Sequence, residues 1–219
     1  MMMDLFAPRQ TYTRPERISD GVIHVAGVLL ALTAVPVLIT LTATMRGDMA
    51  AITGASIYGA TLIAMLACSA VYNISGPCAW EGVLRRLDHS AIYLKIAGTY
   101  SAFVLISGQG AMLLTGLWAA AAAGTALKVA APHRFRWVGL ALYLGMGWAG
   151  LVAGWPMLST LPAPVLAMVV AGGVIYTLGV PFYLMSRLPY HIAVWHGFVL
   201  TASAVFFAAV LTHVLTGTP

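Results

Sequence analysis

Apolar residues dominate this chain in long runs that short polar stretches separate. Each run is about 20 residues long, the length that an α-helix needs to cross about 30 Å of hydrocarbon. We find none of the short alternating segments that are typical of a membrane β-barrel. The pattern therefore predicts an all-α polytopic membrane protein, a seven-transmembrane helix bundle with spans at about 20–44, 49–74, 87–107, 110–129, 136–155, 164–185 and 192–215.

The predicted spans fill nearly the whole chain, which leaves no room for a soluble domain. Residues 1–18 are polar, and we expect them to be a cytoplasmic N-terminal tail without fixed structure. Residues 19–217 are expected to form the transmembrane domain. The first apolar run is too long for a signal peptide and no small-residue cleavage site follows it, so we expect it to remain as a membrane helix.

Composition supports the membrane assignment, and the placement of charge adds an orientation. The chain is 61% hydrophobic and 8% charged, with a net charge of +5. By the positive-inside rule, the basic residues in alternate loops place the N-terminus in the cytoplasm and the C-terminus outside. Membrane topology therefore explains the excess of basic residues without nucleic-acid binding. Arg46 is the one basic residue in the opposite loops; the cytoplasmic set is Arg9, Arg14, Arg17, Arg85, Arg86, Lys128, Arg134, Arg136 and Arg187.

Polar residues inside the spans gather at one predicted depth, near the cytoplasmic helix ends. Ionisable groups within a membrane are expensive to bury and are functional candidates for that reason. The polar residues lie where spans 1, 3 and 7 begin and where span 2 ends, so we expect four separate stretches of the chain to meet. These residues are Asp20, His24, Ser69, Asn73, Asp88, His89, His191 and His196.

Helical spacing separates these candidates into those that share a face and those that do not. Residues four apart differ by about 40°, so Asp20 can face the same way as His24. His191 and His196 are five apart, about 140°, and would not bind one ion together in a regular helix. The alternative for each of these histidines is a position at the membrane interface with no ligand bound. We expect His213, near the outer end of span 7, to be solvated.

At this point the chain resembles the hemolysin III family, within the progestin and adipoQ receptor superfamily that includes the adiponectin receptors. The resemblance covers about residues 14–212 and rests on "ERISDGVIHVAGVLLAL" at 16–32, "CSAVYN" at 68–73, "RRLDHSAIYLKIAGTYSAF" at 85–103, "GGVIYTLGVPFY" at 172–183 and "HIAVWHGFVLTAS" at 191–203. It implies seven transmembrane helices, a cytoplasmic N-terminus and a zinc ion near the cytoplasmic face. The expected location is the bacterial cell (inner) membrane, with the protein crossing it several times.

The family's zinc ligands map onto this chain only in part. The resemblance implies one histidine ending a Ser-x-x-x-His motif, two histidines four apart in span 7, and a nearby aspartate that positions water. Ser69, Asp88 and His196 match, and Asp88 and Ser69 are the catalytic candidates. Asn73 and Ile192 stand at the other two ligand positions, so the expected zinc site is degenerate. Its possible metal ligands are His196, Asn73, Asp88 and His191.

Lys95 is a second departure, because the resemblance leads us to expect an apolar residue there. It follows Asp88 by seven residues, about 20° around the helix and roughly 10 Å deeper. Helical side chains lean toward the helix N-terminus, here toward Asp88. We hypothesise that Lys95 replaces the metal's charge and pairs with Asp88, in a polar pocket that includes Asp20 and His24. The alternative is that Lys95 snorkels alone.

Three function classes follow for a protein whose expected partner is membrane lipid. The favoured hypothesis is a membrane protein that binds or senses a lipid or proton in its polar pocket. The alternative, implied by the resemblance to receptors with ceramidase-like activity, is a zinc-dependent hydrolase of lipid amides or esters. The third is a pore-forming cytolysin, although no continuous polar stripe that would line a channel is present.

Overall fold

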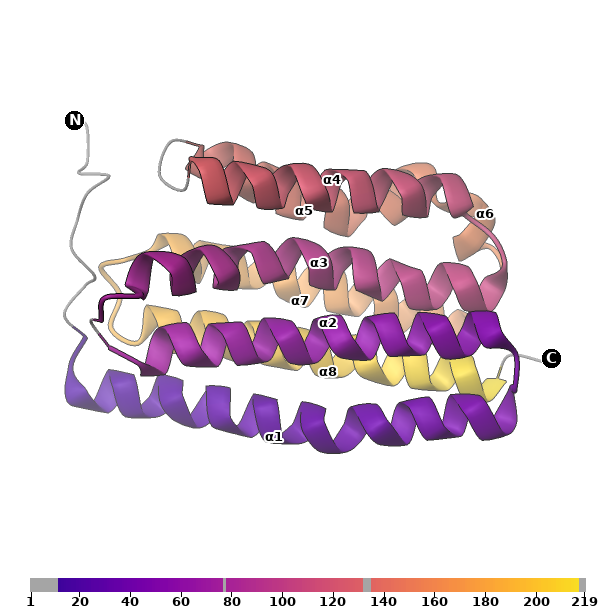
Figure 1. Cartoon of the computed structure of the whole chain (residues 1–219), viewed down its shortest axis with the longest axis horizontal. Coiled ribbons are helices and arrows are strands. Elements are labelled where there is room, and N and C mark those ends of the chain that lie inside the picture. Colours follow the sequence, from indigo (N-terminus) through magenta and orange to yellow (C-terminus); the bar gives the residue numbers. More distant parts are fainter. Residues whose placement is uncertain (1–11, 77, 132–134, 217–219) are drawn as a thin grey trace.

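The structure is a computed structural model, and it describes residues 12–76, 78–131 and 135–216. In the described part of the chain all regular structure is helical, and the helices run side by side along one long axis (Figure 1). Their order is α1 (Arg14–Met45), α2 (Met49–Ile74), α3 (Glu81–Ser107), α4 (Ala111–Ala130), α5 (Arg136–Ala153), α6 (Trp155–Leu158), α7 (Ala163–Leu184) and α8 (His191–Thr216). The prediction of an all-helical polytopic bundle is confirmed.

Six of the described helices are long and apolar enough to cross a membrane. They are α1, α2, α3, α4, α7 and α8. The fifth predicted span corresponds to α5, whose apolar part Trp137–Ala153 is shorter, and Gly154 separates it from the four-residue α6. Membrane crossing by α5, and with it the count of seven spans and the placement of the termini, stays a prediction.

Local sequence signals fix the ends of α1. Thr13 caps its first turn, since its hydroxyl accepts from the backbone N–H of Glu16 while the Glu16 carboxylate accepts from the backbone N–H of Thr13. The helix ends where Gly47 adopts φ +69°, and Asp48 then caps α2 by accepting from Ala51 N at 2.7 Å. Part of the predicted tail, 14–18, is therefore helical, and residues 1–11 lie outside the described part.

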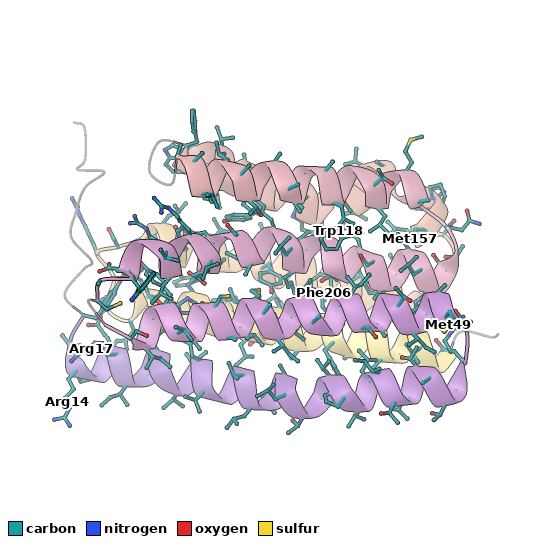
Figure 2. All side chains as sticks on the ribbon, in the orientation of Figure 1. Arg14, Arg17, Met49, Trp118, Met157 and Phe206 are labelled. Atoms are coloured by element: carbon teal, nitrogen blue, oxygen red, sulfur yellow. The ribbon has the colours of Figure 1, made fainter. Side chains whose placement is uncertain are left out.

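The core sits around α3, which is the most enclosed of the candidate spans. On one side α3 packs against α2 and through it toward α1 and α8; on the other side it packs against α4 and α5 (Figure 1). Gly98 marks the closest approach, because a Cβ there would lie 2.1 Å from Thr61 Oγ1 on α2. Figure 2 shows Arg14 and Arg17 at the end of the bundle where α1 begins and Met49 at the opposite end.

Candidate metal centre

The centre begins with two residues on the buried face of α1. Asp20 and His24 are one turn apart, and they are 9% and 4% exposed. The same face continues with Gly27 and Ala31, both buried against neighbouring helices. The spacing of four residues thus carries both polar side chains into the bundle, as predicted, while the opposite face of α1 stays exposed.

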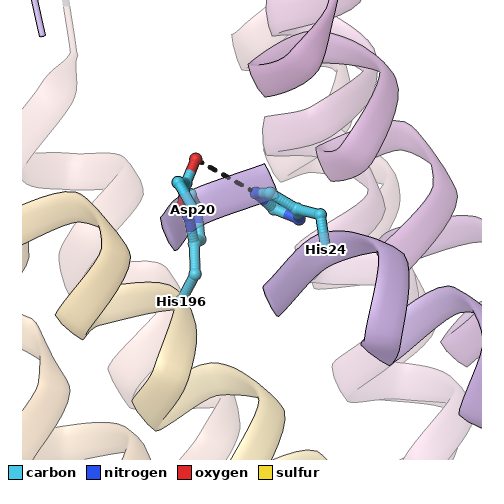
Figure 3. A group of neighbouring side chains, drawn as sticks. All are labelled: Asp20, His24 and His196. Atoms are coloured by element: carbon cyan, nitrogen blue, oxygen red, sulfur yellow. Dashed lines mark hydrogen bonds and ion pairs between the residues drawn. The ribbon is translucent and has the colours of Figure 1, made fainter. Parts of the chain in front are cut away.

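The last helix supplies the third side chain, His196 of α8. Its Nδ1 lies 2.5 Å from Oδ1 of Asp20. This short hydrogen bond joins α8 to α1, and the two residues are 176 positions apart in the sequence. His24 Nε2 lies 3.5 Å from Asp20 Oδ2, and the two imidazole rings are 4.3 Å apart between centroids. Figure 3 shows the carboxylate of Asp20 between the two histidines.

These three residues present a donor set that fits a transition metal. One ligand atom from each of Asp20, His24 and His196 lies within 4.8 Å of the other two. His24 Nε2 is buried and has no hydrogen-bond partner of good geometry, so it is available as a ligand. Two imidazoles and one carboxylate are the set that catalytic zinc commonly takes, with a fourth position left for water or substrate. The residues therefore fit the zinc that the family resemblance implies.

Asp88 and Ser69 flank this cluster from α3 and α2. Asp88 is 8% exposed, its carboxylate is hydrogen-bonded by Ser69, and it interacts electrostatically with His196 and His24. The expected convergence of α1, α2, α3 and α8 at one depth therefore appears in the structure. Asp88 lies beside the three candidate metal ligands Asp20, His24 and His196, which we call the donor group, without being one of them. A carboxylate in this position can accept and donate protons.

Two of the predicted metal ligands lie elsewhere. Asn73 turns back on its own helix, where its Nδ2 donates to Ser69 O at 2.9 Å and approaches Ser69 Oγ at 3.4 Å. His191 is buried, with its Nδ1 3.2 Å from Phe182 O and its ring near that of Tyr12. Among the His, Cys, Asp and Glu side chains of the described residues, the group that could hold a metal ion is Asp20, His24 and His196, and it includes neither His191 nor Asp88. His213, which we expected to be solvated, is buried as well, at 4% exposed, so that expectation is wrong.

Lys95 does not pair with Asp88 in the described part of the chain, so the hypothesis of a direct ion pair is wrong. Lys95 is 3% exposed, and its Nζ lies 4.8 Å from the ring centroid of Tyr176 and 4.7 Å from that of Phe206. The side chain thus points toward α7 and α8, where aromatic faces replace a counter-ion. The snorkelling alternative is wrong as well, since the ammonium stays inside the bundle.

Sequence reasoning placed Asp20 and His24 in the polar pocket but did not propose them as ligands. The signal was present, because a carboxylate and an imidazole four residues apart on one helix can share a metal. What was missing was the packing of α1 against α8, which brings His196 to them. Spacing had already separated His191 from His196, and the structure agrees, since the two rings have different partners.

Comparison with known proteins gives one consistent result. A family model described as "Haemolysin-III related" matches residues 12–207. "Hemolysin-3" of Bacillus cereus is 35% identical over 211 residues, which cover 94% of this chain and 95% of that protein. "Hemolysin-3 homolog" of Bacillus subtilis (strain 168) is 33% identical over 205 residues, covering 92% and 96%. The human "Monocyte to macrophage differentiation factor" is 32% identical over 166 residues, covering 70% and 67%. With most of its length matched, this chain belongs to the haemolysin III-related family.

Proposed function

We propose that this membrane protein holds a divalent metal ion between Asp20, His24 and His196, and that it hydrolyses an amide or ester bond of a membrane lipid there. The convergence of three buried donor groups from α1 and α8 carries the proposal. Zinc is the best fit, because two imidazoles and a carboxylate suit it. When bound, it would supply Lewis acidity and favour ionisation of a coordinated water.

The chain's own residues supply the remaining parts of such a site. Asp88 is held by a hydrogen bond from Ser69, so its carboxylate has a fixed orientation beside the donor group. In this position Asp88 would accept the proton of a water molecule and later return it to the leaving group. Ser69 acts as a positioning residue, because it touches the carboxylate rather than the substrate.

The surroundings of the centre favour a lipid substrate. Asp20 and His24 point inward from α1, and the outer face of the same turns is apolar and exposed. A shallow groove on that face is lined by Ile18, Gly21, Val22, Val25, Ala26 and Leu29. Helix α1 itself separates this groove from Asp20 and His24, so the groove indicates lipid contact at the level of the centre and does not form a path into it. A lipid substrate is proposed because the centre lies inside a bundle of membrane helices.

The first test is metal content. The purified protein, loaded with zinc and washed, should retain about one zinc per chain. Asp20→Asn and His24→Gln should each reduce retention at least tenfold, since loss even of outer-shell partners costs 10- to 100-fold in affinity. His191→Gln is the matched control, because His191 is also a buried histidine but lies outside the donor group. Equal retention by all four proteins would refute the metal site.

The second test is hydrolysis in reconstituted vesicles. A ceramide-type amide and a matched ester, each with a fluorescent acyl chain, serve as probes. Asp88→Asn should reduce turnover by about 10²- to 10⁴-fold, the usual contribution of a general acid–base group. At saturating zinc its metal content should stay near one ion per chain, since the three ligands are intact and Asp88 lies outside the group that they form. Full activity in Asp88→Asn would remove Asp88 from the mechanism, and no turnover of either probe by the metal-loaded protein would remove hydrolysis of these two lipid classes.

One observation favours a second function, metal-free binding of a proton or lipid. The direct 2.5 Å contact between Asp20 and His196 already satisfies the carboxylate without an ion. Histidine is the side chain that proteins most often use to sense protons, and here it is bonded directly to a carboxylate. If the zinc test fails, vesicle flotation with and without a pH step should show pH-dependent lipid retention that Asp20→Asn abolishes. Retention that is independent of pH in both proteins would reject this function.

A further inference from the structure

A second polar contact joins the N-terminal region of α1 to the start of α8, at the end of the bundle where both helices begin (Figure 1). Glu16 lies one turn before Asp20 on α1, and its Oε1 accepts the backbone N–H of Tyr190 at 2.8 Å. Residues four apart share a helix face, so Glu16 and Asp20 are both turned toward the last helix. The two helices are therefore joined by hydrogen bonds at two successive levels.

The carboxylate of Glu16 is oriented by α1 itself. Its Oε2 accepts from the backbone N–H of Thr13 at 2.8 Å and from the Thr13 hydroxyl at 2.7 Å, which completes the capping box of the helix. With Oε2 held in this way, Oε1 presents a fixed acceptor to Tyr190. Little side-chain freedom is then lost when the contact with Tyr190 forms.

The backbone of Tyr190 needs such a contact. Tyr190 has φ +58°, and it is the only non-glycine residue in the described part of the chain with a positive φ. The left-handed region is sterically unfavourable for a residue with a side chain, and it persists where surrounding contacts enforce it. The Tyr190 carbonyl accepts from Val194 N at 2.9 Å, so the same residue also begins the hydrogen bonding of α8. Glu16 thus holds the residue from which α8 starts.

We propose that Glu16 is a positioning residue for the donor group, because it sets where α8 begins and so places His196 opposite Asp20 and His24. His196 follows Tyr190 by six residues, about 9 Å along a helix. The contact between Asp20 and His196 fixes one point of α8, and the Glu16 contact adds a second point, which together fix the direction of α8 relative to α1.

The donor group is sensitive to this placement. Its three ligand atoms lie within 4.8 Å of one another, and one of them comes from α8 while two come from α1. A pivot of α8 about its start would move His196 away from the other two. The effect of Glu16 on metal affinity rests on the proposed function, whereas its effect on the start of α8 does not.

Zinc affinity of the detergent-purified full chain, measured against a competing chelator, is the first arm of the test. Glu16→Ala and Glu16→Asp should each weaken binding about tenfold or more, as expected for a residue that supports a ligand. Glu16→Asp keeps the charge but is too short to reach Tyr190. Glu16→Gln keeps the length and one acceptor oxygen, and should stay within about threefold of the unmodified protein.

Thr13→Ala is the matched control, because it weakens the cap of α1 without removing the Tyr190 contact. It should lower the thermal midpoint, as a lost cap does, yet leave zinc affinity unchanged. If Thr13→Ala lost as much affinity as Glu16→Ala, the effect would be one of stability and the proposal would be overturned. Unchanged affinity in Glu16→Ala would overturn it as well.

Hydrogen exchange of the metal-free protein, followed by mass spectrometry, is the second arm and needs no zinc. In Glu16→Ala and Glu16→Asp, the amides of residues 190–194 should exchange faster than in the unmodified protein and in Glu16→Gln. In Thr13→Ala, faster exchange should be confined to the first turn of α1. If the unmodified protein retained no zinc, the proposed function would fail and this arm alone would decide. Equal exchange of residues 190–194 in every variant would show that Glu16 does not position α8.

Discussion

At the scale of single residues, the hydroxyl of Tyr100 is bonded twice across an interhelical contact. It donates to Gly147 O at 2.8 Å and accepts from Gly150 N at 2.9 Å, so α3 is tied to two points of α5. Tyr100→Phe should lower the free energy of unfolding by about 1–3 kcal/mol, because it leaves these backbone groups without that partner. Thermal unfolding in detergent measures this, with exposed Tyr190→Phe as control. An unchanged midpoint would mean that α5 is held by packing alone.

For Lys95, by contrast, we predict a substitution that raises the free energy of unfolding. Insertion scales put the cost of a lysine at the centre of a membrane helix at about 2.5–3.5 kcal/mol, and cation–π contacts with Tyr176 and Phe206 return about 2 kcal/mol. Lys95→Met should therefore raise the free energy of unfolding by about 1 kcal/mol. Lys95→Arg, which keeps the charge, should show no such gain. A loss of stability in Lys95→Met would reveal a counter-ion bound inside the bundle.

At the scale of helices, the contact of α2 with α3 depends on a missing side chain. A Cβ at Gly98 would lie 2.1 Å from Thr61 Oγ1. Gly98→Ala should therefore destabilise the protein by about 1–3 kcal/mol through overpacking, although alanine is the better helix former. Gly116→Ala on α4 meets nothing within 4 Å and should be neutral or slightly stabilising. Equal melting temperatures for the two variants would contradict the close approach.

Most helices could be predicted from hydropathy, and the exceptions have local causes. The range 49–74 was predicted for α2 and is observed. Helix α1 begins earlier than predicted, at Arg14, because its first turns are polar but capped by Thr13 and Glu16. Part of the site was also predictable, since Asp20 and His24 share a face at any orientation of α1. The approach of His196 was not, because hydropathy does not indicate which helices pack together.

At the scale of the whole molecule, the number of membrane crossings decides on which side of the membrane the C-terminus lies. Helix α5 has 18 residues, about 27 Å at 1.5 Å per residue, slightly less than the hydrocarbon thickness. We expect α5 to cross, which makes seven spans and places the termini on opposite sides. In a Cys78→Ser background, an impermeant thiol reagent added to intact cells should label Thr216→Cys but not Arg14→Cys. Labelling of both positions, or of neither, would indicate an even number of crossings.

The contact between Asp20 and His196 has a consequence for biosynthesis. It joins the first helix of the bundle to the last, across 176 residues of sequence. A chain inserted from its N-terminus carries Asp20 into the membrane long before its α8 partner has been translated. During that interval α1 holds a carboxylate and an imidazole that its own helix cannot fully satisfy. Formation of this contact therefore marks a chain whose last helix has arrived, and truncated chains would keep a polar site that quality-control proteases can recognise.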